Sequence, residues 1–269
     1  MARLEIADGE VVYYEYEPPK ARGQTFVFVN ALTGSTAMWT GEICPRLQAE
    51  GYGTLVWNFR GQALTEFADA TALTPGLIVG DLVRLMAEVR PAEPILVGLS
   101  IGGLFAGQAC LAGVAARGLV LINTLRKPGQ RLDWINRAMV ELARIGGGRL
   151  VMTANMASIA SPALIARMWD NAFSGAAYEP PVATDGLYRL MQGSLETDWD
   201  FPYETLDMKV LILTGEHDRL FRIDADVAEL MARIPNVEEK RYPQAGHLIP
   251  MEDPAGFASD LLVFAERCG

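Results

Sequence analysis

Five stretches of this chain are apolar at nearly every position. They cover residues 25–30, 53–58, 95–99, 119–123 and 210–214. A strand with one face in water alternates polar and apolar residues, so an uninterrupted apolar strand must be covered on both faces. Residues with helical apolar spacing fill most of the intervals between these strands. This alternation predicts an α/β fold with a doubly wound, mostly parallel sheet.

The remaining predicted elements extend the same pattern. Residues 10–17 alternate polar and apolar side chains and predict a half-exposed outer strand, and residues 237–242 predict a last strand. Helices are expected at 36–50, 77–89, 101–111, 224–233 and 254–267.

One long segment interrupts the alternation. Residues 123 to 210 carry no strong strand signal but contain helical patterns at 132–145, 149–158, 162–173 and 184–195. A loop of that length without secondary structure is improbable in a compact domain, so we expect a helical insertion over one edge of the sheet. The predicted division is a core domain of residues 1–125 and 206–269 and a helical lid of residues 126–205.

Charge and cysteine content exclude several classes of function. The net charge of −10 disfavours a nucleic-acid partner. Cys44, Cys110 and Cys268 have no paired spacing, which argues against a disulfide framework or a zinc cluster and predicts a reducing, cytoplasmic location. The apolar run at 95–122 contains clustered glycines, so we interpret it as strand, turn, helix and strand rather than a membrane span. The first ten residues lack the apolar core of a signal peptide.

Ser100 lies between a predicted strand and a predicted helix, in the sequence Val-Gly-Leu-Ser-Ile-Gly-Gly at 97–103. A serine on so sharp a turn is exposed for nucleophilic attack, provided that its neighbours lack Cβ atoms. Gly98 and Gly102 meet that need. The amide of Ile101, at the helix N-terminus, could then stabilise an oxyanion. The alternative is a phosphate-binding or plain tight turn, but no Gly-Lys-Ser/Thr or Gly-x-Gly-x-x-Gly pattern is present.

A nucleophilic serine needs a base and an acid that orients the base. The chain has two histidines, and His247 follows the predicted last strand, where α/β sheets place their chemistry. His217 is adjacent to Asp218, and sequence neighbours rarely achieve a good orienting hydrogen bond, so we favour His247. Asp218 follows the strand at 210–214 and is the favoured acid, with Glu216 as the second candidate.

Together, Gly98–Gly103, Gly215–Asp218 and Ala245–His247 resemble the motifs of lid-bearing serine hydrolases of the α/β-hydrolase superfamily, over nearly the whole chain. The resemblance implies the α/β-hydrolase fold with a lid after the sixth strand. It also implies cleavage of a carboxylic ester or related acyl bond of a small molecule, with no metal or organic cofactor. A carbon–carbon bond hydrolase, a lactonase, an acyltransferase or a ligand-sensing receptor of the same fold would share these residues.

Two segments depart from the family pattern. Residues 58–65 resemble its Asp-x-Arg-Gly-x-Gly-x-Ser turn but carry Asn58, Ala63 and Thr65. After the third strand the family usually has His-Gly, where this chain has Asn30-Ala31. By position, Leu32 is then expected to supply the second oxyanion amide beside Ile101.

The substrate pocket is the least constrained part of the prediction. Methionine and aromatic residues in the lid suit an adaptable apolar pocket. Basic residues at 126, 127, 131, 137, 144 and 149 could include one that meets an acidic substrate, although we expect most of them to be solvated. The candidate pocket residues are Asn30, Thr33, Trp134, Met168, Trp169 and Leu248.

Overall fold

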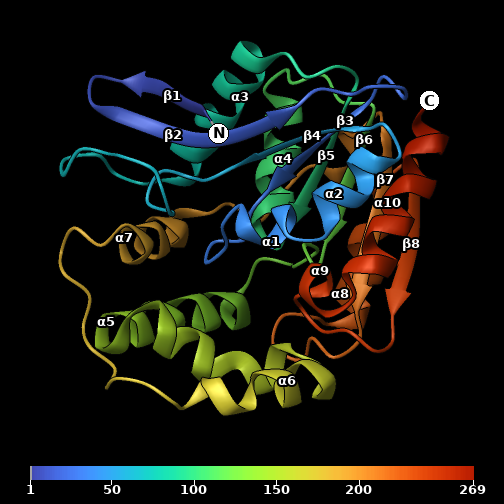
Figure 1. Cartoon of the computed structure of the whole chain (residues 1–269). Helices are drawn as coiled ribbons and strands as arrows, with labels where there is room; N and C mark the ends of the chain where they lie inside the picture. Colours follow the sequence, from blue (N-terminus) through green and yellow to red (C-terminus); the bar gives the residue numbers. More distant parts are fainter. Residues whose placement is uncertain (1) are drawn as a thin grey trace.

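The computed structural model describes residues 2–269, and these residues form one eight-stranded sheet with helices on both faces (Figure 1). The strand order is β1-β2-β4-β3-β5-β6-β7-β8. The β1–β2 and β2–β4 pairs are antiparallel, and the other neighbouring pairs are parallel. The strands are β1 (Ala2–Ala7), β2 (Glu10–Glu17), β3 (Thr25–Val29), β4 (Gly53–Trp57), β5 (Pro94–Leu99), β6 (Gly118–Ile122), β7 (Lys209–Gly215) and β8 (Val237–Tyr242).

From β3 onward, helices alternate with the strands, and an additional group of helices lies between β6 and β7. The helices are α1 (Ala37–Thr40), α2 (Ile43–Ala49), α3 (Pro75–Val89), α4 (Ile101–Leu111), α5 (Gln130–Ile159), α6 (Pro162–Ala172), α7 (Gly186–Gly193), α8 (Asp224–Met231), α9 (Ile249–Glu252) and α10 (Pro254–Cys268). Short 3-10 turns cover Ser194–Glu196 and Tyr203–Thr205. The predicted fold class is therefore confirmed, while β1 and α9 are additions that the sequence analysis missed.

The central strands are buried on both faces, as their continuous apolar sequences require. In β3, Val27 and Val29 pack into one core cluster with residues of α3, α4 and α8. Phe26 and Phe28 point to the opposite face and pack with residues of α1, α2 and α10. Each fully buried side chain of this size contributes roughly 1.5–3 kcal/mol through removal of apolar surface from water.

The register brings the carboxyl ends of six parallel strands, β3 to β8, to one edge. Val29 of β3 pairs with Gly98 of β5, and Leu99 of β5 pairs with Ile122 of β6. Ile122 in turn pairs with Leu213 of β7. The loops after β3, β5, β6, β7 and β8 therefore open side by side, which is where chemistry gathers in sheets of this kind.

The helical insertion lies beyond that edge. Helices α5 and α6 lie together at the lower end of the molecule, toward which the arrow of β8 points (Figure 1). Helix α5 is two helices joined at Gly146 and Gly147, where φ is −147° and 64°. This kink matches the two predicted helices at 132–145 and 149–158. Whether residues 126–205 act as a separate lid stays a prediction.

The apolar run at 95–122 forms β5, α4 and β6, as expected. Across residues 2–269, no helix combines the length and the apolar character that crossing a bilayer would demand.

A buried arginine fixes the turn after β4. Arg60 is 6% exposed and binds both carboxylate oxygens of Asp81 in α3, at 2.8 and 2.6 Å. It also pairs with Glu10 of β2. Two carboxylates thus surround one buried guanidinium, and bidentate pairs of this kind hold geometry as well as charge. The turn at residues 58–65 is therefore anchored to a strand and a helix.

The start of α4 packs directly on the end of β3. A Cβ atom on Gly102 would lie 2.2 Å from the carbonyl oxygen of Asn30 and 2.5 Å from that of Val29. Real Cβ atoms do not approach backbone oxygen so closely, so only glycine allows this contact.

We predict that Gly102→Ala lowers the free energy of unfolding by about 2 kcal/mol or more, because helix and strand must separate to admit the methyl group. Gly80→Ala is the matched control, since Gly80 lies inside α3 with open space around its Cα. That substitution should stabilise the protein by about 0.5–1 kcal/mol through helix propensity. Urea unfolding of both variants measures the difference, and equal effects would contradict the close contact.

Candidate active site

Ser100 occupies the turn between β5 and α4 with φ 61° and ψ −125°. A positive φ at a residue with a side chain costs on the order of 1–3 kcal/mol and persists only where the surroundings impose it. Here the Ser100 amide donates to the carbonyl of Ile122 at 2.8 Å. A Cβ on Gly98 would lie 2.4 Å from Cα of Gly103, so strand and helix need these glycines to meet at the turn. The geometry is that of the nucleophile turn predicted from sequence.

His247 and Asp218 form a buried pair. Nδ1 of His247 lies 2.6 Å from Oδ2 of Asp218, and both side chains are nearly inaccessible to water. The other oxygen of Asp218 accepts from the amides of Leu220 and Phe221 at 3.2 and 3.0 Å. With Asp218 ionised, Nδ1 carries the proton and Nε2 is left as an acceptor.

Burial by itself would raise the pKa of Asp218. The charge of His247 and its hydrogen bond, the amide of Phe221 and the charge of Arg126 together outweigh burial, and they hold the pKa of Asp218 below its ordinary value. The carboxylate is therefore ionised at neutral pH and can stabilise a positive charge on the imidazole.

Two groups that the sequence analysis did not select hold the loop of His247 in place. Glu252 of α9 accepts from the amides of Gly246 and Leu248, at 2.8 and 3.2 Å. Asn123, directly after β6, donates to the carbonyls of Gly246 and His247. The contacts of Asn123 join residues far apart in the chain, so they cannot be predicted from a local sequence pattern.

The alternative base and acid stand apart from this pair. His217 and Glu216 are partly exposed, and neither borders the cavity that contains Ser100. The structure therefore brings Ser100, Asp218 and His247 to one edge and leaves the second candidates outside. Their catalytic roles stay predictions.

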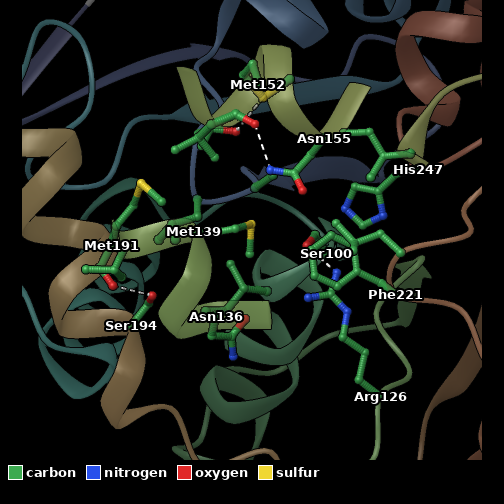
Figure 2. A pocket seen from close by; sticks show the side chains of 18 of the residues that line it. Ser100, Arg126, Asn136, Met139, Met152, Asn155, Met191, Ser194, Phe221 and His247 are labelled. Carbon is green, nitrogen blue, oxygen red and sulfur yellow. Dashed lines mark hydrogen bonds between the residues drawn. The ribbon is translucent and has the colours of Figure 1, made fainter. Parts of the chain in front are cut away.

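The hydroxyl oxygen of Ser100 accepts a hydrogen bond from an arginine. Nη2 of Arg126, in the loop after β6, donates to Oγ of Ser100 at 2.6 Å. Within residues 2–269 no hydrogen bond joins Ser100 to His247, although both side chains face the same cavity (Figure 2). Catalytic hydrogen bonds are often absent or long before substrate binds. In the sequence, Arg126 is one of six basic residues between 126 and 149, and no pattern distinguishes it from the other five.

The two predicted oxyanion amides belong to residues that line the cavity of Ser100. Leu32 follows β3, Ile101 opens α4, and both residues border the cavity beside Ser100. Over the described part of the chain, neither amide has a hydrogen-bond acceptor. Two free amides beside a serine side chain are suited to a developing oxyanion.

A buried network of three side-chain amides holds the loop that carries Leu32. Oδ1 of Asn30 accepts from the indole of Trp39 at 2.7 Å, and its Nδ2 donates to Gln62 at 2.9 Å and to Asn58 at 3.1 Å. Nε2 of Gln62 then donates to the carbonyls of Ala31 and Leu32, at 2.9 and 3.1 Å. The departures from the family pattern at Asn30 and Asn58 are therefore partners in one network.

The cavity is lined mainly by apolar side chains of the helical insertion and of the loops (Figure 2). Polar groups are few, and Arg126 is the one Lys, Arg, Asp or Glu side chain in its wall among the described residues. Thr33 and Leu248, both predicted pocket residues, belong to the wall. The apolar members include Met139, Val140, Val151, Met152, Ile159, Met191, Trp199 and Phe221.

Four predicted pocket residues lie elsewhere, which corrects that part of the prediction. Asn30 is 1% exposed, and its side-chain amide is hydrogen-bonded within the buried amide network. Trp134 is 79% exposed on the outer face of α5. Met168 and Trp169 border a separate hollow between α5 and α6. Helical spacing predicted the elements correctly but did not show which face of each helix turns toward Ser100.

No group of three or more His, Cys, Asp or Glu side chains in residues 2–269 is placed to hold a metal ion. The polar groups around Ser100 include the histidine–aspartate pair, the arginine and two backbone amides, and the side chains of Thr33, Asn136, Asn155 and Ser194 also line the cavity. Together with Ser100, these groups can attack, transfer a proton and stabilise an anion.

Comparison with known proteins identifies the family. Residues 26–260 match the profile described as the alpha/beta hydrolase family. The chain belongs to this family, and its enzymatic class is that of a hydrolase.

The relatives differ in their named activities. "Putative non-heme bromoperoxidase BpoC" of Mycobacterium tuberculosis is 24% identical over 252 residues, which cover 90% of this chain and 94% of that protein. A thermophilic esterase from Thermogutta terrifontis has a TM-score of 0.81 at 18% identity, covering 100% of this chain and 99% of that one. The enol-lactonase from Burkholderia xenovorans LB400 has a TM-score of 0.77 at 20% identity, covering 95% and 96%. These likenesses show a shared fold.

We predict that Gln62→Met lowers the free energy of unfolding by about 2 kcal/mol or more. Methionine has similar length but leaves Asn30, the Phe59 amide and two loop carbonyls without their buried partner. Gln244→Met, at an exposed position before α9, should change stability by less than about 0.5 kcal/mol. Chemical denaturation of both variants tests this, and a Gln62→Met protein as stable as the control would refute the role of the network.

Proposed function

We propose that the protein is a serine hydrolase that cleaves a carboxylic ester or related acyl bond of a small, largely apolar molecule through an acyl-enzyme. The observation that carries the proposal is the buried His247–Asp218 pair, whose histidine borders the same cavity as Ser100 on its strained turn. The hydrolase family and the esterase and lactonase among its structural neighbours support it.

In the proposed acylation, Oγ of Ser100 forms a bond to the carbonyl carbon while Nε2 of His247 takes its proton. The carbonyl π electrons move to oxygen, and the amides of Leu32 and Ile101 stabilise the resulting anion. When the intermediate collapses, the bond to the leaving group breaks and His247 returns the proton to that group. Asp218 stabilises the imidazolium that exists between these two transfers.

Deacylation repeats the sequence with water. His247 takes a proton from the water, the hydroxide adds to the acyl carbon, and collapse releases the acid while Ser100 regains its proton. The apolar wall favours an apolar substrate body, because burial of that surface supplies the binding energy.

We predict that a fluorophosphonate probe labels the protein at Ser100 and that short p-nitrophenyl esters are turned over. The Ser100→Ala variant should show neither, since the remaining oxyanion amides give only residual catalysis. Intact mass and peptide mapping locate the label. If the folded wild type shows neither labelling nor turnover, the proposed serine mechanism is refuted, and a ligand-sensing role for the same cavity gains support.

We predict that His247→Ala lowers kcat by roughly 10⁴-fold or more, because the serine loses its base. His217→Ala serves as the matched control, being the other histidine of the chain, and should retain kcat within about threefold. Asp218→Asn should lower kcat strongly, as His247→Ala does, whereas Glu216→Gln should leave kcat nearly unchanged. Similar losses in the two histidine variants would show that the base is wrongly assigned.

A further inference from the structure

Arg126 is a buried cation that stands at the nucleophile. Its side chain is 6% exposed, and its guanidinium lies against the face of Phe221, 3.8 Å from the ring centroid, and 5.1 Å from that of Trp199. Figure 2 shows its head beside Ser100, within the cavity wall. Aromatic faces attract a cation and also fix the plane in which a guanidinium can lie.

Arg126 forms no salt bridge in the described residues; the charge of Asp218 acts on it from beyond 4.0 Å, but that carboxylate is already paired with His247. No carboxylate oxygen lies within 4.0 Å of it, and its Nε is buried without any hydrogen-bond acceptor. The bonds it makes, to Oγ of Ser100 and to the carbonyl of Asn123 at 3.4 Å, are to neutral groups. Burial lowers the pKa of Arg126 to about 10, so the side chain is still a cation at neutral pH.

Arg60 shows how this same protein treats a buried arginine that has a structural role. It is equally buried, yet Asp81 and Glu10 both pair with it. Buried charges are normally paired, because an uncompensated charge in a low-dielectric interior is strongly destabilising. Arg126 departs from that rule in the wall of the cavity that contains Ser100, where an incoming molecule can supply an anion.

We propose that Arg126 binds a carboxylate group of the substrate, held within a few bonds of the carbon that Ser100 attacks. The guanidinium touches Oγ of Ser100 itself, so an anion that pairs with it must lie close to the reacting atom. For the reaction, though not for binding, this inference rests on the proposed hydrolase function.

A carboxylate fits this site better than a phosphate. The planar fork of a guanidinium matches the two oxygens of a carboxylate. The cavity wall offers one cation, so a dianionic phosphate would leave a second charge uncompensated among apolar side chains. The ligand class is therefore a short acid or half-ester with an apolar body.

Binding of such an anion would also free the nucleophile. In the structure, Oγ of Ser100 accepts from Arg126 instead of donating to His247. A carboxylate that takes over Nη2 of Arg126 releases the serine hydroxyl toward the imidazole. The same side chain thus selects the substrate and couples its arrival to readiness of the serine.

The direct test is calorimetric binding to the full-length Ser100→Ala protein, which needs no turnover. Butyrate and butyramide are the probes, because they share shape and differ in charge. We expect butyrate to bind on the order of 10- to 100-fold more tightly. The preference should vanish in Ser100→Ala/Arg126→Met and survive in part in Ser100→Ala/Arg126→Lys.

Ser100→Ala/Arg137→Met is the matched control, because Arg137 is an exposed arginine of α5 and its loss removes the same net charge. It should keep the full preference for butyrate. Equal affinity for the two probes, absence of measurable binding by either, or a preference that survives Arg126→Met would each overturn the proposal.

A kinetic arm separates recognition from a merely structural role. Monoethyl succinate and ethyl butyrate differ by a carboxylate in place of a terminal methyl group. We expect kcat/KM of the wild type to favour the half-ester, and Arg126→Met to reduce that ratio about tenfold or more. A fall of both values by one common factor would contradict substrate recognition. If neither ester is turned over, the hydrolase proposal fails while the binding results still decide the role of Arg126.

Discussion

The contact between Gly102 and the end of β3 is the constraint on which the site depends. Backbone atoms of α4 approach the carbonyls of Val29 and Asn30 so closely that no side chain fits between them. That approach sets the start of α4, and with it the strained turn of Ser100 and the amide of Ile101. It also sets the end of β3, from which the loop of Leu32 departs. The close approach of these two segments therefore fixes the positions of Ser100 and of both predicted oxyanion donors relative to one another.

The fold, and the placement of Ser100, Asp218 and His247 at one edge of the sheet, were predictable because their signals are local. Continuous apolar strands require a covered sheet, and two histidines leave few choices of base. The pocket was not predictable in the same way. Trp134 and Trp169 lie on helices that were correctly expected, but helical spacing does not say which face turns inward. Gln62, Glu252 and Arg126 make contacts between segments that are distant in the chain. A single sequence does not show which distant residues come into contact.

The two buried arginines illustrate how similar burial serves different ends. Arg60 lies between two carboxylates, which compensate its buried positive charge. Arg126 is held by aromatic faces and neutral oxygens, which orient the guanidinium without neutralising its charge. Its charge also contributes to the low pKa of Asp218, so the arginine supports the ionised state of the acid that orients His247. A site built in this way is complete only when an anion is present.

The amide network under the Leu32 loop has a consequence for the response of the protein to acidity. Where the family pattern has aspartate and histidine, this chain has Asn58 and Asn30, and Gln62 joins them. None of these three side chains gains or loses a proton across the physiological range. The side-chain network that holds the Leu32 loop therefore keeps its hydrogen bonds as acidity changes, whereas the neighbouring His247–Asp218 pair depends on the ionised state of its carboxylate.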